Sequence, residues 1–200
     1  MKFNTRDLAT IAVFGALWGI VEISLGTLLK SMNVPLSGAV LATIGLAVAL
    51  TGRVFVPKRG ATLFTGVIAM LLKLFSLGGI IIGPIIGILA EALIAEIVLT
   101  TTRKPHRVSF LLSGSLGVLW TLFQPLLTGV LLFGRGLVEI WADIINKGSK
   151  VLGLNPNAAL SVVLVLVVIH LALGGIGGWL GWNIGKQLYA RLGRTYSNRA

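Results

Sequence analysis

Long apolar runs separated by short polar segments dominate the chain. A helix needs about 20 mostly apolar residues to cross a bilayer. The runs predict six transmembrane helices, near residues 8–29, 36–52, 60–76, 80–102, 108–133 and 158–186. Open strands would leave backbone groups unpaired in lipid, and the runs do not alternate as barrel strands do. We therefore expect an all-α, polytopic membrane bundle.

The segment 135–157 has a different pattern, because its apolar residues recur at helical spacing and charged residues fill the remaining positions. The apolar members are Leu137, Ile140, Trp141, Ile144, Ile145, Val151 and Leu152. This pattern predicts an amphipathic helix at the outer membrane interface, between the fifth and sixth spans. Two interpretations stay open, a plain surface connection and a lid over a site.

The composition agrees with a membrane location. The 200 residues are 56% hydrophobic and 12% charged, whereas soluble domains have about 25% charged residues. We see no linker, so we expect one integral membrane domain over residues 1–200. The chain has no cysteine, which excludes disulfides, thiolate metal sites and cysteine nucleophiles.

The net charge of +11 points to membrane topology rather than to nucleic acid, because the charges lie between the apolar runs. With the N-terminus in the cytoplasm, 12 of the 17 Lys and Arg residues fall on the inner side and 4 on the outer side, while Lys73 lies within a span. The positive-inside rule then predicts a multi-pass protein of the cell membrane with both termini cytoplasmic.

Small residues form ridges on the first and last predicted helices. The first ridge contains Ala12, Gly15, Ala16 and Gly19, and the second contains Gly174, Gly178, Gly181 and Gly185. Small residues let helix backbones approach closely in lipid. The ridges predict either packing of the first helix against the last, or docking of a partner membrane protein.

The segment 12–16, AVFGA, has an Ala-x-x-x-Ala pattern. With this motif, its size, its basic character and its six predicted spans, the chain resembles a substrate-binding S component of an energy-coupling factor (ECF) vitamin transporter. The resemblance implies capture of a small vitamin-like ligand in the outer half of the bundle. It also implies that the ridge packs against a transmembrane coupling subunit, and that two cytoplasmic ATPases drive uptake. The chain has no phosphate-binding Gly-x-x-x-x-Gly-Lys-Ser/Thr loop of its own. It begins Met1-Lys2 rather than Met-His, which argues against the cobalt branch of the family.

Polar residues within the predicted spans are the candidate site residues, because an ionisable group in lipid is costly. The candidates are Glu22, Lys73, Glu91, Glu96, His170 and the neutral Gln124. Helix depth at 1.5 Å per residue brings Glu22, Lys73, Glu91 and Gln124 toward one cavity in the outer half. We predict a substrate site formed by these four residues, with Asn33 from the loop 31–38 and Trp141 as a stacking surface. The loop 77–79 is a second candidate cover.

Other interpretations of these residues stay open. Glu22 and Lys73 also fit a structural ion pair, and Glu91 fits pairing as well as ligand contact. We expect Glu96 to be structural, since it lies about 140° around the helix from Glu91, and His170 to hydrogen-bond between helices. The two histidines are far apart and the carboxylates do not cluster, so we expect no metal or other cofactor.

The first functional hypothesis is capture of a small water-soluble vitamin or precursor, in which Glu22 and Glu91 bind a cationic or amino-bearing group. A thiamine-like or aminopyrimidine ligand fits that chemistry. The alternative is a free-standing secondary transporter or proton-coupled carrier with a relay through Glu91, Glu96 and His170. No internal repeat supports the alternative. The sequence also has no Ser-His-Asp, metal or phosphate motif, so we do not expect an enzyme.

Overall fold

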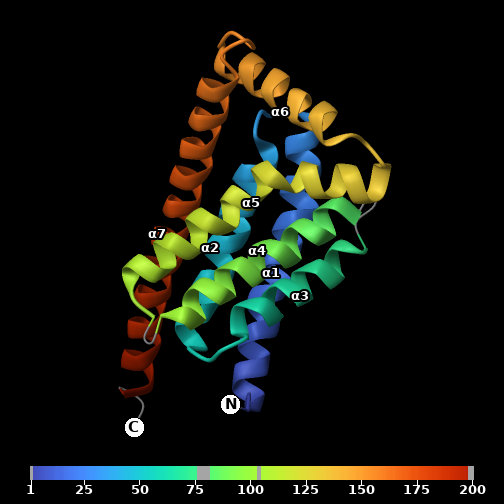
Figure 1. The fold of residues 1–200 in the computed structure, drawn as a ribbon. Coiled ribbons are helices and arrows are strands. Elements are labelled where there is room, and N and C mark those ends of the chain that lie inside the picture. The colour runs from blue at the N-terminus through green and yellow to red at the C-terminus, as the bar shows by residue number, and fades with distance from the viewer. Residues whose placement is uncertain (1, 76–81, 103–104, 198–200) are drawn as a thin grey trace.

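The computed structural model describes residues 2–75, 82–102 and 105–197, with side chains as far as residue 192. Within these ranges the chain is all-helical, as predicted (Figure 1). The helices are α1 (Thr5–Ser31), α2 (Ser37–Phe55), α3 (Ala61–Lys73), α4 (Ile82–Thr101), α5 (Arg107–Phe133), α6 (Leu137–Leu152) and α7 (Ala159–Ser197). The helix α6 therefore lies within residues 135–157, the segment in which the sequence predicted a helix between the fifth and sixth spans.

Five of these helices, α1, α2, α4, α5 and α7, are long and apolar enough to cross a membrane. The expected third span is shorter than the sequence indicated. α3 has 13 residues and is therefore about 20 Å long, against a hydrocarbon core about 30 Å thick. The last helix is longer than expected, because it continues past residue 186 to Ser197.

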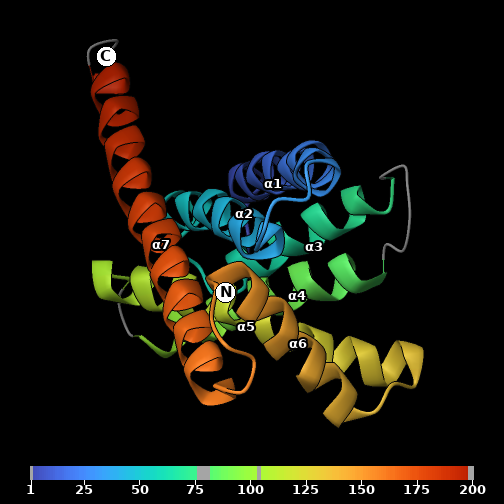
Figure 2. The same ribbon diagram turned by 90° about the horizontal axis from the view of Figure 1, so that it is seen from above.

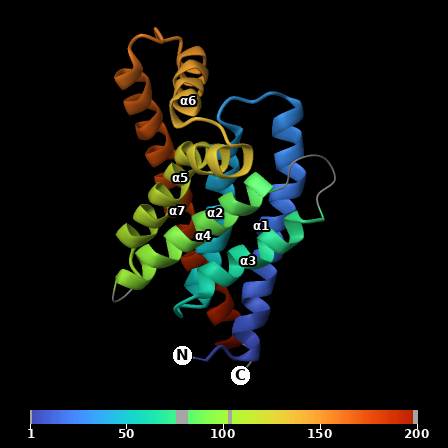
Figure 3. The ribbon, with the colours of Figure 1, turned by 45° about the vertical axis from the view of Figure 1, so that its right-hand side comes forward.

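The arrangement of the helices puts both termini at one end of the molecule (Figures 1 and 3). α6 lies across the opposite end, where it follows α5 and leads into α7. Seen from above, α2 lies between α1 and α7 (Figure 2). α1 packs against α2 and α3, and α7 packs against α2 and α5. The predicted packing of the first helix against the last is therefore wrong.

The glycine ridge of α7 packs against two neighbours. A Cβ atom added at Gly178 would lie 2.1 Å from the backbone oxygen of Phe110 in α5. Farther along α7, a Cβ at Gly181 would lie 2.7 Å from the Cβ of Leu50 in α2. The ridge thus lets the backbone of α7 pack closely against α5 and α2, as small residues do in membrane bundles.

The ridge of α1 is partly buried within the bundle and partly exposed on its surface. Gly15 and Gly19 are buried and face α3, where an added Cβ would lie 2.7 Å from the Cβ of Ile68 and 2.8 Å from the Cβ of Leu72, respectively. Ala12 is exposed and Ala16 is half-buried. The two glycines therefore serve internal packing, and the two alanines remain on the outer surface of the bundle.

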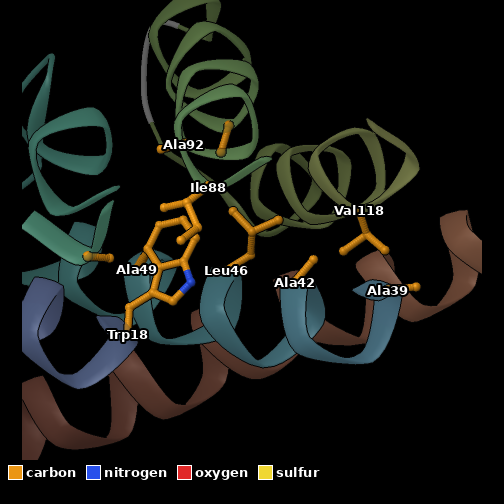
Figure 4. Packing of buried hydrophobic residues seen from close by; sticks show 10 residues of the cluster. Trp18, Ala39, Ala42, Leu46, Ala49, Ile88, Ala92 and Val118 are labelled. Carbon is orange, nitrogen blue, oxygen red and sulfur yellow. The ribbon is translucent and has the colours of Figure 1, made fainter. Parts of the chain in front are cut away.

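The main apolar core lies between α1, α2, α3 and α4, with Val118 of α5 joining it. Trp18 is its largest member and is completely buried. Its indole lies close to Ile88 and Leu46 (Figure 4). Gly45 gives it room, because a Cβ there would lie 2.0 Å from the indole Nε1. This core fixes α1 relative to α4. Glu22 follows Trp18 by one turn of α1, so its position is fixed as well.

A polar contact joins three segments near the end that carries the termini. Glu96 of α4 accepts hydrogen bonds from the backbone N–H groups of Gly60 (2.7 Å) and Thr62 (3.0 Å) at the start of α3. Arg53 of α2 also lies 3.3 Å from Glu96, between Nη2 and Oε1, and both side chains are buried. The predicted structural role of Glu96 agrees with these contacts.

Candidate functional site

A cavity of about 270 Å³ opens between α1, α2, α3, α4 and α5. It is close to the lower size limit of about 300 Å³ for ligand pockets in proteins. Its polar lining residues are Glu22, Lys30, Ser37, Lys73, Glu91, Thr121, Gln124 and Thr128. The four span residues that helix depth brought together, Glu22, Lys73, Glu91 and Gln124, are all in this set. We call it the first cavity.

Glu22 and Lys73 form a buried ion pair at the wall of the first cavity. Lys73 Nζ lies 3.6 Å from Glu22 Oε2 and donates a hydrogen bond of 2.5 Å to the backbone oxygen of the same residue. Gly26 makes room for the lysine, because a Cβ there would lie 3.3 Å from Nζ. The structural ion pair and the cavity position therefore coexist, and each charge largely neutralises the other.

Glu91 is the unusual residue of the first cavity. Its side chain is buried at 5% exposure, and its Oε2 atom has no hydrogen-bond partner among the described residues. A buried polar atom without a partner raises the free energy of the folded state, and such atoms often lie where a ligand binds. Lys73 is already paired with Glu22, so the cavity wall presents one carboxylate oxygen, Glu91 Oε2, that has no partner among the described residues.

Gln124 is held in place by α4. Its Nε2 donates a hydrogen bond of 2.7 Å to the backbone oxygen of Gly83. Gly87 gives the amide room, because a Cβ there would lie 2.7 Å from Gln124 Oε1. Gly83 and Gly87, at four-residue spacing before Glu91, thus let α5 approach α4 beside this acid. Pro125 follows within α5 and removes one backbone donor at this level.

A second, larger cavity of about 630 Å³ lies between α2, α5, α6 and α7. Most of its lining is apolar, including Leu122, Ile144 and Leu166. Its polar side chains are those of Asn33, Thr121, Lys147, Lys150 and His170. Gly38, Thr121 and Pro125 line both cavities, so the two cavities adjoin. We call it the second cavity.

Residues 5–191 match the family described as "Hypothetical bacterial integral membrane protein (Trep_Strep)". The chain belongs to the Trep_Strep family. It is therefore an integral membrane protein, in agreement with its composition and its five long apolar helices. No curated protein and no solved structure matches the chain.

Two of the predicted site residues of this Trep_Strep protein lie away from the first cavity, and the prediction of a single cluster of six is corrected accordingly. Asn33 lines the second cavity, at a left-handed φ of 50° in the loop between α1 and α2. Trp141 is half-buried on α6 and is in the lining of neither cavity. The loop 77–79, the second candidate cover, lies outside the described residues.

The residues of the predicted proton relay do not come together. Glu91 lines the first cavity, His170 lines the second, and Glu96 is engaged at the start of α3. The ring Nδ1 of His170 donates a hydrogen bond of 2.7 Å to the backbone oxygen of Leu166, four residues earlier in the same helix. The expected hydrogen bond of His170 is thus present, but within α7 rather than between helices.

Sequence reasoning missed several polar residues of the first cavity. Thr121 and Thr128 lie three residues before and four residues after Gln124, so helical spacing alone puts them on its face. Ser37 and Lys30 flank the loop between α1 and α2 and lie at the level of the predicted outer end. Their polar character was visible, but nothing in the sequence distinguished them from ordinary loop residues.

Proposed function

We propose that this protein is the substrate-binding subunit of an uptake system for a small water-soluble vitamin or vitamin precursor. The observation that carries the proposal is the buried Oε2 atom of Glu91 in the first cavity, which has no partner among the described residues. A ligand with a cationic or hydrogen-bond-donating group would satisfy this carboxylate, and charge-assisted hydrogen bonds of this kind are among the strongest in proteins. A thiamine-like or aminopyrimidine compound, with an amino group on an aromatic ring, is the ligand class that fits first.

The energy for uptake would come from separate subunits, a transmembrane coupling protein and two cytoplasmic ATPases, as in the ECF transporters that the sequence resembles. The proposal includes no enzymatic step in this chain. It puts both termini in the cytoplasm, which the charge bias of the loops supports, together with the position of both termini at one end of the molecule. Ligand would then enter from the end that carries α6.

The docking surface for the coupling protein would be the outward side of α1. Ala12 and Ala16 are its small residues, since Gly15 and Gly19 already pack against α3. Replacing both alanines by leucine would keep ligand binding and abolish coupled uptake. Uptake driven by a gradient in vesicles that contain this chain alone would contradict the proposal and favour a free-standing carrier.

The direct test of the binding function is the variant Glu22→Gln, for which we expect a lower ligand affinity with expression and folding intact. The amide keeps the shape of the side chain, and Lys73 keeps its hydrogen bond to the backbone oxygen of residue 22. An unchanged affinity would remove Glu22 from the binding site. Glu91→Gln should lower the affinity further than Glu22→Gln does, because Glu22 shares its charge with Lys73 whereas Glu91 Oε2 has no partner among the described residues.

A further inference from the structure

The two cavities share part of their lining. Gly38 near the start of α2 and Thr121 and Pro125 on one side of α5 line both of them. Gly38 leaves the boundary open, because a Cβ added there would meet no atom within 4 Å. The two cavities therefore lie next to each other, and a space that joined them would pass Gly38.

The two ends of this combined space differ in charge. The first end contains two acids, Glu22 and Glu91, and two lysines, Lys30 and Lys73. Lys73 is paired with Glu22, and the Oε2 atom of Glu91 has no partner among the described residues. Among the described residues that line the second cavity none is acidic, whereas Lys147 and Lys150 of α6 both contribute. His170 adds a ring whose Nδ1 is occupied by Leu166, which leaves Nε2 for a ligand.

The acids of α6 are engaged elsewhere. Arg135 Nη2 lies 2.6 Å from Glu139 Oε1 and 2.7 Å from Asp143 Oδ2. These two carboxylates therefore pair with Arg135 rather than with the lysines of the second cavity. Lys147 also interacts electrostatically with Asp143, so part of its charge is already balanced on α6. Lys150 lines the second cavity beside it, and no acidic residue is in the described lining of that cavity.

We propose that the two cavities form one extended site for an elongated molecule with a cationic or donor group at one end and an anionic group at the other. The first end would bind Glu91, the apolar middle would pass Gly38 and lie against Leu122 and Leu166, and a carboxylate or phosphate would bind Lys147 and Lys150. This inference rests on the proposed function and narrows its substrate class, from any amino-bearing vitamin-like molecule to one with opposite charges at its two ends.

The experiment compares the purified full chain with three variants. Each protein is incubated with the low-molecular-weight fraction of a bacterial cell extract and washed, and the retained molecules are identified by mass spectrometry. Gly38→Phe adds a large side chain at the boundary, where an added Cβ meets no described atom within 4 Å. Gly136→Phe is its matched control, because a Cβ at Gly136 also meets no atom within 4 Å and Gly136 is in the lining of neither cavity. The third variant is the double substitution Lys147→Gln and Lys150→Gln.

We expect the unmodified chain and Gly136→Phe to retain one compound with both a cationic and an anionic group. The double lysine variant should retain it about tenfold less, because a charge-assisted contact is worth about that factor or more. Gly38→Phe should also retain less of it, because the added side chain would occupy the space between the two cavities. Circular dichroism and thermal unfolding should be the same in all four proteins, so that a folding defect cannot account for the loss.

Three results would overturn the extended site while leaving the binding function intact: a retained compound without an anionic group, equal retention by the double lysine variant, or equal retention by Gly38→Phe. Retention of an anionic phospholipid that depends on the lysines would show that the second cavity is a separate lipid site, and would also overturn it. If the unmodified chain retains no water-soluble compound, the proposed function fails, and the extended site fails with it.

Discussion

Lys73 Nζ lies 3.6 Å from Glu22 Oε2 and 2.5 Å from the backbone oxygen of Glu22, and both side chains are buried. The lysine of α3 is thus fixed to α1 by two contacts with one residue. Two carboxylates and two lysines, this one and Lys30, line the first cavity. The pairing of Lys73 with Glu22 engages one of the two acids. It leaves Glu91 without a protein partner among the described residues.

The pairing predicts unequal effects of the two single substitutions. Lys73→Met leaves the Glu22 carboxylate buried beside Glu91 without a cation, and we expect it to destabilise the protein by about 3–5 kcal/mol. Glu22→Gln should cost much less, because Lys73 keeps its bond to the backbone oxygen. Thermal unfolding in detergent measures both. Equal losses in the two variants would mean that the backbone contact contributes nothing.

The contact of Glu96 with the start of α3 predicts a structural role that is independent of the ligand. Glu96→Ala removes the acceptor of two backbone N–H groups and leaves Arg53 buried without its ion pair. We expect a loss of about 3–5 kcal/mol in the free energy of unfolding. The affinity for ligand should be unchanged in the fraction that remains folded, and a specific loss of affinity would contradict this assignment.

The approach of α5 to α7 predicts a steric penalty at Gly114. A Cβ there would lie 2.1 Å from the backbone oxygen of Gly174 and 2.7 Å from the backbone nitrogen of Gly178. Backbone atoms cannot move aside as a flexible side chain can, so we expect Gly114→Ala to cost about 3 kcal/mol or more. Gly136→Ala is the control without a steric clash, since no described atom lies within 4 Å of an added Cβ. It should cost about 1 kcal/mol or less, because Gly136 is the N-cap of α6 and alanine is a poorer N-cap than glycine. Similar stability of the two variants would contradict the close contact.

The contact between Arg135 and Asp143 predicts that the stability of the protein depends on pH in acid. The hydrogen bond from Arg135 holds the pKa of Asp143 below its ordinary value of 3.8. A lowered pKa stabilises the folded state above the ordinary value, and this stabilisation is lost as the pH falls through the pKa of the folded protein. The difference in unfolding temperature between the unmodified chain and Asp143→Asn should therefore persist from pH 7 to pH 5, values at which Asp143 stays ionised, and disappear in stronger acid. A difference that disappears already at pH 5 would contradict the pairing.

The sequence predicted the all-helical class and the depth of several span residues, because both depend on local patterns. The amphipathic pattern of 135–157 located a helix at Leu137–Leu152, and helix depth brought Glu22, Lys73, Glu91 and Gln124 together. Depth works for these residues because a spanning helix fixes position along one axis. The sequence did not predict that α3 ends at Lys73, because the apolar run continues beyond that residue.

The sequence was insufficient for the choice of helix neighbours. Gly15 and Gly19 contact α3. The sequence had indicated the glycine ridge of α7 as their partner, because its residues are equally small. Small-residue spacing shows that a helix packs closely but not against which neighbour. Trp18 illustrates the same limit, because only the structure shows that it fills the core beside Gly45 rather than facing lipid. The placement of Trp141 outside the first cavity also depends on how α6 lies across the bundle.

The most direct test of the central claim is mass spectrometry of the small molecules released from gently purified protein, with the unmodified chain and Glu91→Gln compared side by side. We predict one small water-soluble compound at nearly equal stoichiometry with the unmodified chain, and at least about tenfold less with Glu91→Gln. The variant should be as stable as the unmodified protein or more stable, because it removes a buried carboxylate oxygen without a partner. Equal release from both proteins, or release of nothing from the unmodified chain, would contradict the claim that Glu91 holds a captured ligand.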